Sequence, residues 1–362
     1  MTTEPTRGAT EATGAACPRP RKRLHLAARF PGGDRSAVRA DFASFEAPAR
    51  TAERGTFDFF LLAEEPRPHE HVGHPEPLTV LSALAAVTDR LGLAATAGTT
   101  FNEPFELARR FATLDHLSAG RAAWHVVTSS DARTGENFRR GGCPDRAGRR
   151  TRAAEFVRTA RELWDSWTPP APGSPDGAPR PFAHSGPQFE IAGEFTVPRS
   201  PQGHPVIIQA GDSDEARESA AHAADVILTR GGTLEEGRAC YADTKARLAA
   251  YGRKPDDLKI ITSATVVLGD SDAAAREHTA YDPDGPRSFT GTPETVAAEM
   301  DAFVSADAAD GFLLLPPPTP GGLDDFVDRV VPLLRERGAF RTEYEGTTLR
   351  SHLGLPDPVN PV

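Results

Sequence analysis

The sequence LSAGRAAWHVVTSS, residues 117–130, combines a tight turn, a buried strand and a cluster of hydroxyl side chains. Its SAG segment has the small residues of a turn, and the apolar run at residues 122–127 predicts a strand. Three hydroxyl residues follow that strand directly. An apolar strand that ends in small polar side chains, with helical sequence on both sides, is typical of the active end of a parallel α/β barrel.

Short apolar runs alternate with longer stretches of helical periodicity on both sides of this segment. We expect strands at residues 24–30, 57–63, 93–100, 122–127, 205–211, 225–230, 259–269 and 311–316. We expect helices at residues 41–54, 76–90, 104–117, 150–167, 213–224, 233–251, 293–305 and 323–337. This alternation predicts one (β/α)8 TIM barrel over residues 22–340, with insertions after the fourth and seventh strands. A doubly wound open sheet is the alternative, but no GxGxxG motif follows the first strand.

Four segments fall outside the alternation. Residues 168–200 are rich in proline and glycine and contain a predicted hairpin around QFEIAGEFTV. The crossover after the seventh strand is expected to loop through residues 270–290. Residues 1–21 are expected to form a disordered tail, and residues 341–362 a polar tail packed on the surface or on a partner subunit.

Charge and composition exclude several classes of protein. The formal net charge of -10 argues against binding to nucleic acid or to an anionic membrane surface. The three cysteines have no CxxC spacing, which favours a reducing cytoplasm over a disulfide framework or a zinc site. No apolar run is long enough to span a bilayer, and the N-terminus has no secretory apolar region. We therefore expect a cytoplasmic globular protein.

Two groups of residues near strand ends are candidates for binding phosphate. Gly211, Asp212 and Ser213 open a helix directly after a buried strand, where backbone N–H groups and the helix dipole attract anions. An ordinary N-cap is the competing interpretation, and the carboxylate of Asp212 disfavours an anion unless it turns outward. Arg146 and Arg150 precede or begin the fourth helix and can pair with phosphate, or can form a solvated basic helix start.

Other titratable residues have less defined roles. The sequence HEHVGH at residues 69–74 superficially resembles metal-ligand spacing, but no helix or strand fixes it, so we expect a polar lid and no metal. Glu64 ends the second strand and can act as an acid or base or pair with an arginine. Asp115 ends a helix on the opposite rim, where we expect a structural role.

Long runs of the chain resemble the bacterial-luciferase-like flavin-dependent monooxygenases. The similar runs are EPLTVLSALAAVTDRLGLAATAGTTFNEPFELARRFATLDHLSAGRAAWHVVTSS, EFVRTARELWDSW, VPRSPQGHPVIIQAGDSDEARESAAHAADVI and GLDDFVDRVVPLLRERGAFRTEYEGTTLRSHLGL. They are most similar to the branch of nitrilotriacetate, dibenzothiophene-sulfone and pristinamycin-pathway monooxygenases. The resemblance covers residues 22–355 and rests on the conjunction of these runs.

The resemblance implies a barrel that binds FMN, supplied as FMNH2 by a separate NAD(P)H-dependent flavin reductase. It implies that O2 reacts through a C4a-peroxyflavin to oxygenate a small organic substrate, which we expect to bear a heteroatom. It also favours a homodimer or a homotetramer. Two alternatives stay open: a flavin- or deazaflavin-dependent dehydrogenase or reductase, and a relative that has lost flavin and acts as a binding or auxiliary protein.

The family pattern also implies roles for individual residues. The positions matching cofactor contacts are Thr100, Thr128 and Ser129 near the flavin ring and ribityl chain, Gly211, Asp212 and Ser213 at the phosphate, and Glu64 where an aspartate usually faces the flavin.

Three features depart from the pattern. His125 replaces the asparagine of the family's WNVVTS run. Arg146 and Arg150 replace a histidine and a tyrosine that help hold flavin and phosphate, and an arginine can supply a charged contact instead. The loop before the seventh helix is shorter than usual. His125 and Glu64 are the candidates for a catalytic residue, and the resemblance assigns no catalytic residue.

Overall fold

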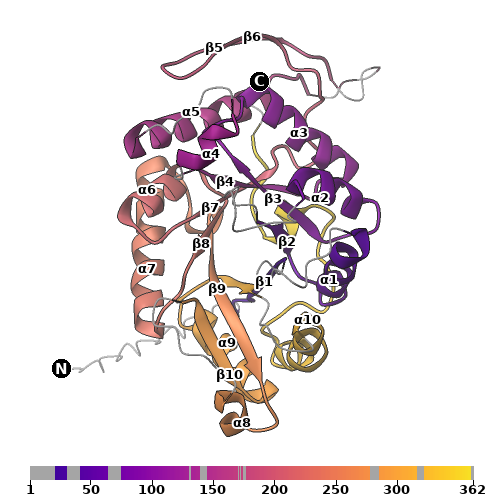
Figure 1. Ribbon diagram of the computed structural model, residues 1–362, viewed down its shortest axis with the longest axis vertical. Helices are drawn as coiled ribbons and strands as arrows, with labels where there is room; N and C mark the ends of the chain where they lie inside the picture. The colour runs from indigo at the N-terminus through magenta and orange to yellow at the C-terminus, as the bar shows by residue number, and fades with distance from the viewer. Residues whose placement is uncertain are drawn as a thin grey trace, which may run out of the picture.

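In the computed structural model of the chain, strand β4 (Ala122–Val127) pairs in parallel with β3 (Gly92–Gly98) and β7 (Val206–Ala210). The nine-stranded sheet closes because β8 (Val226–Thr229) also pairs with β9 (Lys259–Leu268). The remaining barrel strands are β1 (His25–Arg29), β2 (Phe59–Leu62) and β11 (Gly311–Leu315). Figure 1 shows the strands at the centre of a ring of helices, which confirms the predicted TIM barrel.

The described part of the chain comprises residues 21–30, 41–63, 75–129, 132–138, 145–169, 171, 173, 177–277, 285–315 and 322–359. The ring helices are α1 (Phe42–Arg54), α2 (Pro77–Ala85), α3 (Pro104–Leu117), α5 (Arg146–Trp164), α6 (Asp214–Ala223), α7 (Leu234–Arg247), α9 (Pro293–Ser305), α10 (Gly322–Asp325) and α11 (Val331–Glu336). Strand β4 and helices α3 and α9 have the predicted bounds. Helices α2 and α7 end earlier than predicted, and α5 begins earlier, at Arg146. Most of the expected N-terminal tail lies outside the described residues.

The side chains of β4 alternate between the two faces of the barrel wall, as strand geometry requires. Trp124 points outward, where its ring centroid lies 5.4 Å from that of Phe111 and 5.5 Å from that of Phe156. Ala123 belongs to the apolar cluster inside the barrel. His125 lies two residues after Ala123 in the strand, so its side chain points to the same interior face. It lies nearer the carboxyl end of the strand.

Buried aspartates fix the amino ends of several strands. Their carboxylates accept backbone N–H bonds from the starts of neighbouring strands; the pairs are Asp58 with Leu26, Asp115 with Ala122, Asp225 with Ile207, and Asp310 with Ile260. The four donor–acceptor distances are 2.9, 2.9, 2.8 and 2.8 Å in that order. These bonds satisfy N–H groups that begin strands and have no ladder partner there. The expected structural role of Asp115 is confirmed.

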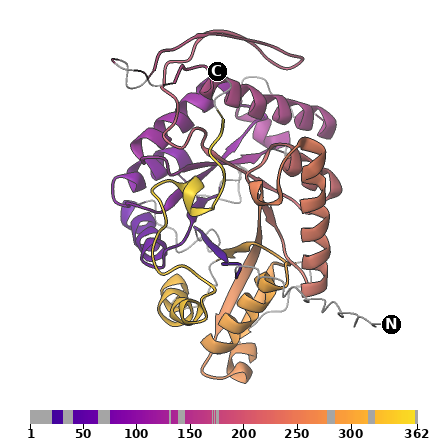
Figure 2. The same cartoon turned by 180° about the vertical axis from the view of Figure 1, so that it is seen from behind.

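The C-terminal segment packs across this amino end of the barrel (Figure 2). Its short helix α12 (Leu349–His352) begins with Leu349, which is fully buried in the cluster inside the barrel together with Leu353. Arg341 donates to the carboxylate of Asp58, and the side chain of Arg350 lies 3.0 Å from the carboxylate of Asp225. The segment is therefore packed more deeply than a tail draped over the surface.

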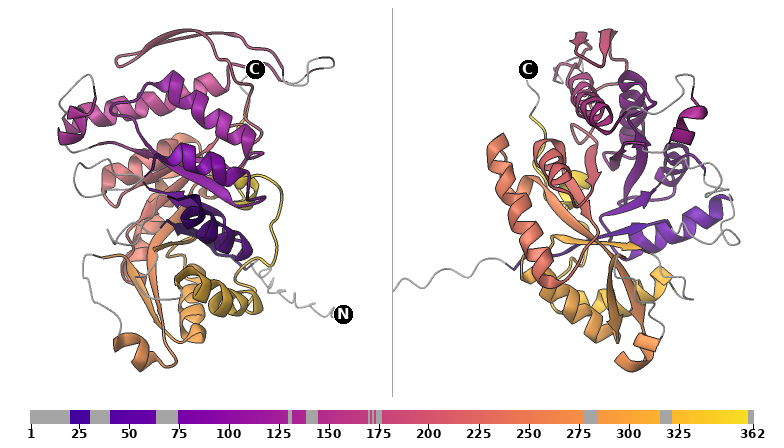
Figure 3. Two further views of the ribbon diagram at one scale, coloured as in Figure 1. Left: turned by 45° about the vertical axis from the view of Figure 1, so that its right-hand side comes forward. Right: turned by 60° about the vertical axis from the view of Figure 1, so that its left-hand side comes forward.

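The insertions differ in how well they were predicted. Strands β5 (Pro181–Ser185) and β6 (Glu190–Glu194) form the expected antiparallel hairpin, which lies outside the ring of helices (Figure 3). The crossover after β9 was expected to be a loop, which is wrong. It contains α8 (Asp272–Glu277) and a ninth strand, β10 (Arg287–Gly291), which pairs in parallel with the outer half of β9. The long β9 provides the unpaired edge that β10 covers. Among the described residues, no helix combines the length and apolar character needed to cross a bilayer.

Replacing Asp115 by asparagine is expected to stabilise the protein at alkaline pH. Burial raises the pKa of Asp115 from 3.8 to about 6, so the folded state binds a proton that the unfolded state loses between those values. Wild-type stability should therefore fall by up to about 3 kcal/mol as pH rises through this window. Asparagine keeps an oxygen that can accept the bonds from Ala122 N–H and Gln202 Nε2 without burying a charge.

Urea unfolding of both proteins at about pH 4 and about pH 8 measures this effect. The Asp115→Asn variant should have a higher free energy of unfolding than wild type only at the higher pH. An equal loss of stability at both pH values would contradict the assignment.

Candidate active site

A cavity of about 1430 Å³ opens at the carboxyl ends of the barrel strands. The described residues that sequence analysis placed in the site all line it: Thr100, His125, Thr128, Ser129, Arg146, Arg150, Gly211, Asp212 and Ser213. Glu64 and the HEHVGH segment lie outside the described residues. The cavity exceeds the size of common small-molecule pockets and offers room for a cofactor and a substrate together.

Two arginines of α5 share one carboxylate at a side of this cavity. Asp145 caps the helix by accepting the Gly148 N–H at 2.7 Å, so the helix begins at Arg146 and places Arg150 one turn further along. The guanidinium groups of Arg146 and Arg150 lie 3.4 and 3.2 Å from Oε2 of Glu215. The hydrogen bond from Arg150 contributes most to lowering the pKa of Glu215. The two guanidinium groups together carry one more charge than this carboxylate, so they have the capacity to pair with a further anion.

The turn at residues 211–213 forms the N-cap that the sequence offered as one of two interpretations. Ser213 is the N-cap of α6, because its hydroxyl oxygen accepts the Ala216 N–H at 3.2 Å. Asp212 is directed to Arg230, whose backbone N–H donates to Asp212 Oδ1 at 2.9 Å. The carboxylate therefore has its own partner, which removes much of the objection to an anion at this turn. All three residues line the same cavity as Arg146 and Arg150.

Alanine at position 211 is expected to distort the turn and weaken binding of any anion there. Gly211 has a φ of +144°, which L-residues rarely adopt, and an added Cβ would lie 2.7 Å from Ala216 Cβ. We expect a loss of about 1–3 kcal/mol in stability and a weaker affinity for FMN. Urea unfolding and FMN titration measure the two effects. Wild-type values for both would contradict a constrained role for this glycine.

The strand ends next to the turn are tied together by hydroxyl and guanidinium groups. The Ser129 N–H donates to Thr100 Oγ1 at 3.0 Å, which links the segments that follow β4 and β3. Arg152 is buried and donates to the carbonyl oxygens of Thr99 and Asn102 at 3.0 and 2.8 Å. Arg152 therefore supports the loop after β3, whereas Arg146 and Arg150 line the cavity.

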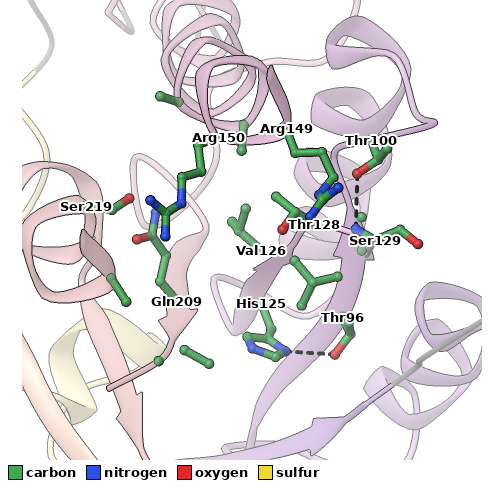
Figure 4. Close-up of a pocket in the computed structure, with 18 of the residues that line it drawn as sticks. Thr96, Thr100, His125, Val126, Thr128, Ser129, Arg149, Arg150, Gln209 and Ser219 are labelled. Carbon is green, nitrogen blue, oxygen red and sulfur yellow. Dashed lines mark hydrogen bonds between the residues drawn. The ribbon is translucent and has the colours of Figure 1, made fainter. Parts of the chain in front are cut away.

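His125 occupies the inner part of the site, as Figure 4 shows. Its Nδ1 lies 2.9 Å from Thr96 Oγ1, and its Nε2 is buried without a hydrogen-bond partner among the described residues. Burial, and secondarily the charge of Arg29, lowers the pKa of His125 to about 4, so the imidazole is neutral near pH 7. His125 is therefore both an interior residue of the barrel and part of the cavity wall.

Sequence analysis missed several residues of the site. Thr96 lies opposite His125 in the pairing of β3 and β4. The alternation of side chains along β3 could have indicated that Thr96 points inward. Phe138 lines the cavity and stacks on Phe101, with the two ring centroids 4.6 Å apart and the rings inclined by 6°. Glu215 was visible only as an acidic residue in a first helical turn, which is common and gives no hint of its partners.

Comparisons with known proteins agree with this geometry. Residues 23–289 match the family described as luciferase-like monooxygenase. The chain is 37% identical over 406 residues to the nitrilotriacetate monooxygenase component A of Aminobacter aminovorans, covering 86% of this chain and 90% of that protein. It is 37% identical over 398 residues to the N-acetyl-S-(2-succino)cysteine monooxygenase of Bacillus subtilis (strain 168), covering 87% and 90%. Among solved structures, the EDTA monooxygenase from Chelativorans sp. BNC1 superposes with a TM-score of 0.83 at 27% identity, covering 93% and 99%.

Proposed function

The chain belongs to the luciferase-like monooxygenase family, and from this premise we propose that it is the oxygenase of a two-component system that uses FMNH2 and O2. The observation that carries the proposal is the shared placement of Arg146 and Arg150 on Glu215 beside the 211–213 turn. This arrangement provides positive charge for the phosphate of FMN at one side of a cavity whose inner part is formed by strand residues.

The residues present fit a flavin mononucleotide. Glu215 already lies as a negative group beside two guanidinium groups at this side of the cavity, which supports a phosphate as a partner for the same arginines. Nε2 of His125, which has no hydrogen-bond partner in the described part of the chain, provides a polar contact deeper in the cavity. Thr100, Thr128 and Ser129 follow the ends of β3 and β4 and line the same cavity, and we propose that they adjoin the ring and the ribityl chain.

Reduced FMN, when bound, would supply the electrons with which O2 gives one oxygen atom to a small organic substrate and the other to water. In this proposal the protein binds the flavin, orients it and shields it from water. Arg146 and Arg150 hold the phosphate, and the Thr100–Ser129 contact keeps the strand ends in place. The stacked Phe101 and Phe138 form an apolar part of the wall that limits the access of water.

The proposal includes a separate NAD(P)H-dependent flavin reductase as the source of FMNH2. The name of the relative from Aminobacter aminovorans, a component A, supports a partner component. A homodimer or homotetramer in the cytoplasm is part of the same proposal and rests on the family resemblance. Gel filtration with light scattering measures the oligomeric state directly.

The activity is tested by supplying the protein with FMN, NADH and a flavin reductase under 18O-labelled O2. Nitrilotriacetate and N-acetyl-S-(2-succino)cysteine are suitable first substrates, because relatives are named for them. A product that carries the label supports a monooxygenase. A product formed without label or O2 uptake favours the dehydrogenase or reductase alternative, and failure to bind FMN in either redox state favours the auxiliary protein.

A further inference from the structure

The most unusual polar atom of the cavity is Nε2 of His125. The side chain is 9% exposed, and this nitrogen has no hydrogen-bond partner among the described residues. A buried polar group without a partner costs about 1–3 kcal/mol, so such groups normally have a protein, water or ligand partner. Because His125 lines the cavity, its partner there is either water or the molecule that the cavity binds in place of that water.

The contact on the other ring nitrogen assigns the proton. Thr96 is buried, and among the described residues its hydroxyl makes one hydrogen bond, to His125 Nδ1 at 2.9 Å. If the hydroxyl donates to Nδ1, its proton is satisfied and Nε2 carries the ring hydrogen. If Nδ1 donates instead, the hydroxyl proton is buried without an acceptor. Hydrogen-bond satisfaction therefore favours the tautomer in which Nε2–H points toward the cavity.

The surroundings of His125 favour an acceptor that carries negative charge. Arg29 ends β1 on the inner face of the barrel, and its charge acts on His125 in the direction that disfavours a second proton. Burial acts in the same direction and more strongly. The residue therefore presents a neutral donor within the positive potential of a neighbouring guanidinium group.

The position of His125 indicates which end of a flavin reaches it. In Figure 4, Arg150 reaches from α5 toward Gln209 and Ser219, whereas His125 lies deeper, beside Thr96. A flavin whose phosphate lies at Arg150 would extend its ring inward. Reduced flavin loses a proton near neutral pH and then carries negative charge along the pyrimidine edge of that ring, which oxidised flavin lacks.

We propose that His125 donates a hydrogen bond from Nε2 to the pyrimidine edge of the flavin ring and thereby makes the cavity select reduced over oxidised FMN. The inference rests on the proposed function, because it requires that flavin is the molecule bound. Thr96 is a positioning residue, since it fixes the tautomer without contacting the ring. A hydrogen bond to a charged acceptor is stronger than one to a neutral acceptor, which is the source of the selectivity.

The test compares the dissociation constants of oxidised and anaerobically reduced FMN for wild type and three variants. His125→Leu is expected to weaken the binding of reduced FMN about tenfold and the binding of oxidised FMN by less than about threefold. His125→Asn keeps a donor and should retain part of the preference. Thr96→Val should lose part of it while leaving His125 in place. The midpoint potential of bound FMN provides a second readout, and His125→Leu should lower it.

Controls separate the possible failures. Riboflavin should show the same effect of His125→Leu, because the contact is to the ring, whereas Arg150→Ala should leave the redox preference unchanged. Equal weakening of both redox states, or greater weakening of the oxidised state, would overturn the role of His125 while leaving the proposed function intact. A wild-type protein that binds neither state overturns both. If His125→Leu does not fold, the Thr96→Val and His125→Asn comparisons decide the question.

Discussion

Replacing Arg146 and Arg150 together by alanine should weaken FMN binding about 100-fold, because each charge-assisted hydrogen bond to a phosphate contributes about 1.5–3 kcal/mol. Arg150→Ala alone should account for about tenfold of this loss. Riboflavin has no phosphate, so its affinity should stay at the wild-type value in both variants. Fluorescence titration of each variant with both flavins measures the effect.

Glu215→Gln is a matched variant that should change the affinity for FMN in the opposite direction. The carboxylate now lies beside the guanidinium groups of Arg146 and Arg150, where it competes with a phosphate for them. Removing its charge should tighten FMN binding by a few-fold and leave riboflavin binding unchanged, and the difference should shrink at high salt. If the arginine variants weaken both flavins equally, the phosphate does not lie at this place.

Replacing Arg341 by leucine should destabilise the protein by about 3–5 kcal/mol, which is typical of removing one partner from a buried ion pair. Arg341 donates to the fully buried Asp58, whose carboxylate also accepts the Leu26 N–H and contacts His25. Burial alone would raise the pKa of Asp58, but the charges of Arg341 and His25 lower it well below its usual range. The variant would leave this carboxylate buried with only the Leu26 N–H and His25 of these three partners.

A double-mutant cycle with Asp58→Asn isolates this interaction from lost packing. Asparagine removes the charge, so Arg341→Leu should cost much less in the Asp58→Asn background than in wild type. Urea unfolding at neutral pH provides the four stabilities. If the double variant lost the sum of the stabilities lost by the two single variants, this result would contradict the coupling between the C-terminal segment and the amino end of β2.

Strong local patterns made most of the barrel predictable. The run from Ala122 to Val127 is apolar and bounded by turn and hydroxyl residues, so the bounds of β4 could be read from the sequence. The start of α5 could not, because Arg146, Gly148 and Arg149 show no apolar periodicity and its buried face becomes continuous only from Glu155. The N-cap at Asp145 was the signal that sequence analysis passed over.

Long-range pairing explains the remaining differences. The sequence RSFTG of β10 is short and polar, and it forms a strand because the outer half of β9 provides backbone partners. The positions of Arg146 and Arg150 in the cavity followed from the barrel topology. Their contact with Glu215 did not, because it joins the first two turns of α5 to the first turn of α6 across the intervening hairpin and β7. Likewise, the alternation of side chains along a strand was enough to infer that His125 points inward. Its contact with Thr96 could not be inferred, because it depends on the register of β3 and β4.

Equilibrium titration of the wild-type protein with FMN, FMNH2 and riboflavin, the reduced form under anaerobic conditions, tests the central claim most directly. We expect saturable binding of FMN in at least one redox state, with FMN bound at least about tenfold more tightly than riboflavin in the same redox state because of its phosphate. Absence of binding to both redox states of FMN would contradict the assignment of this cavity as a flavin site.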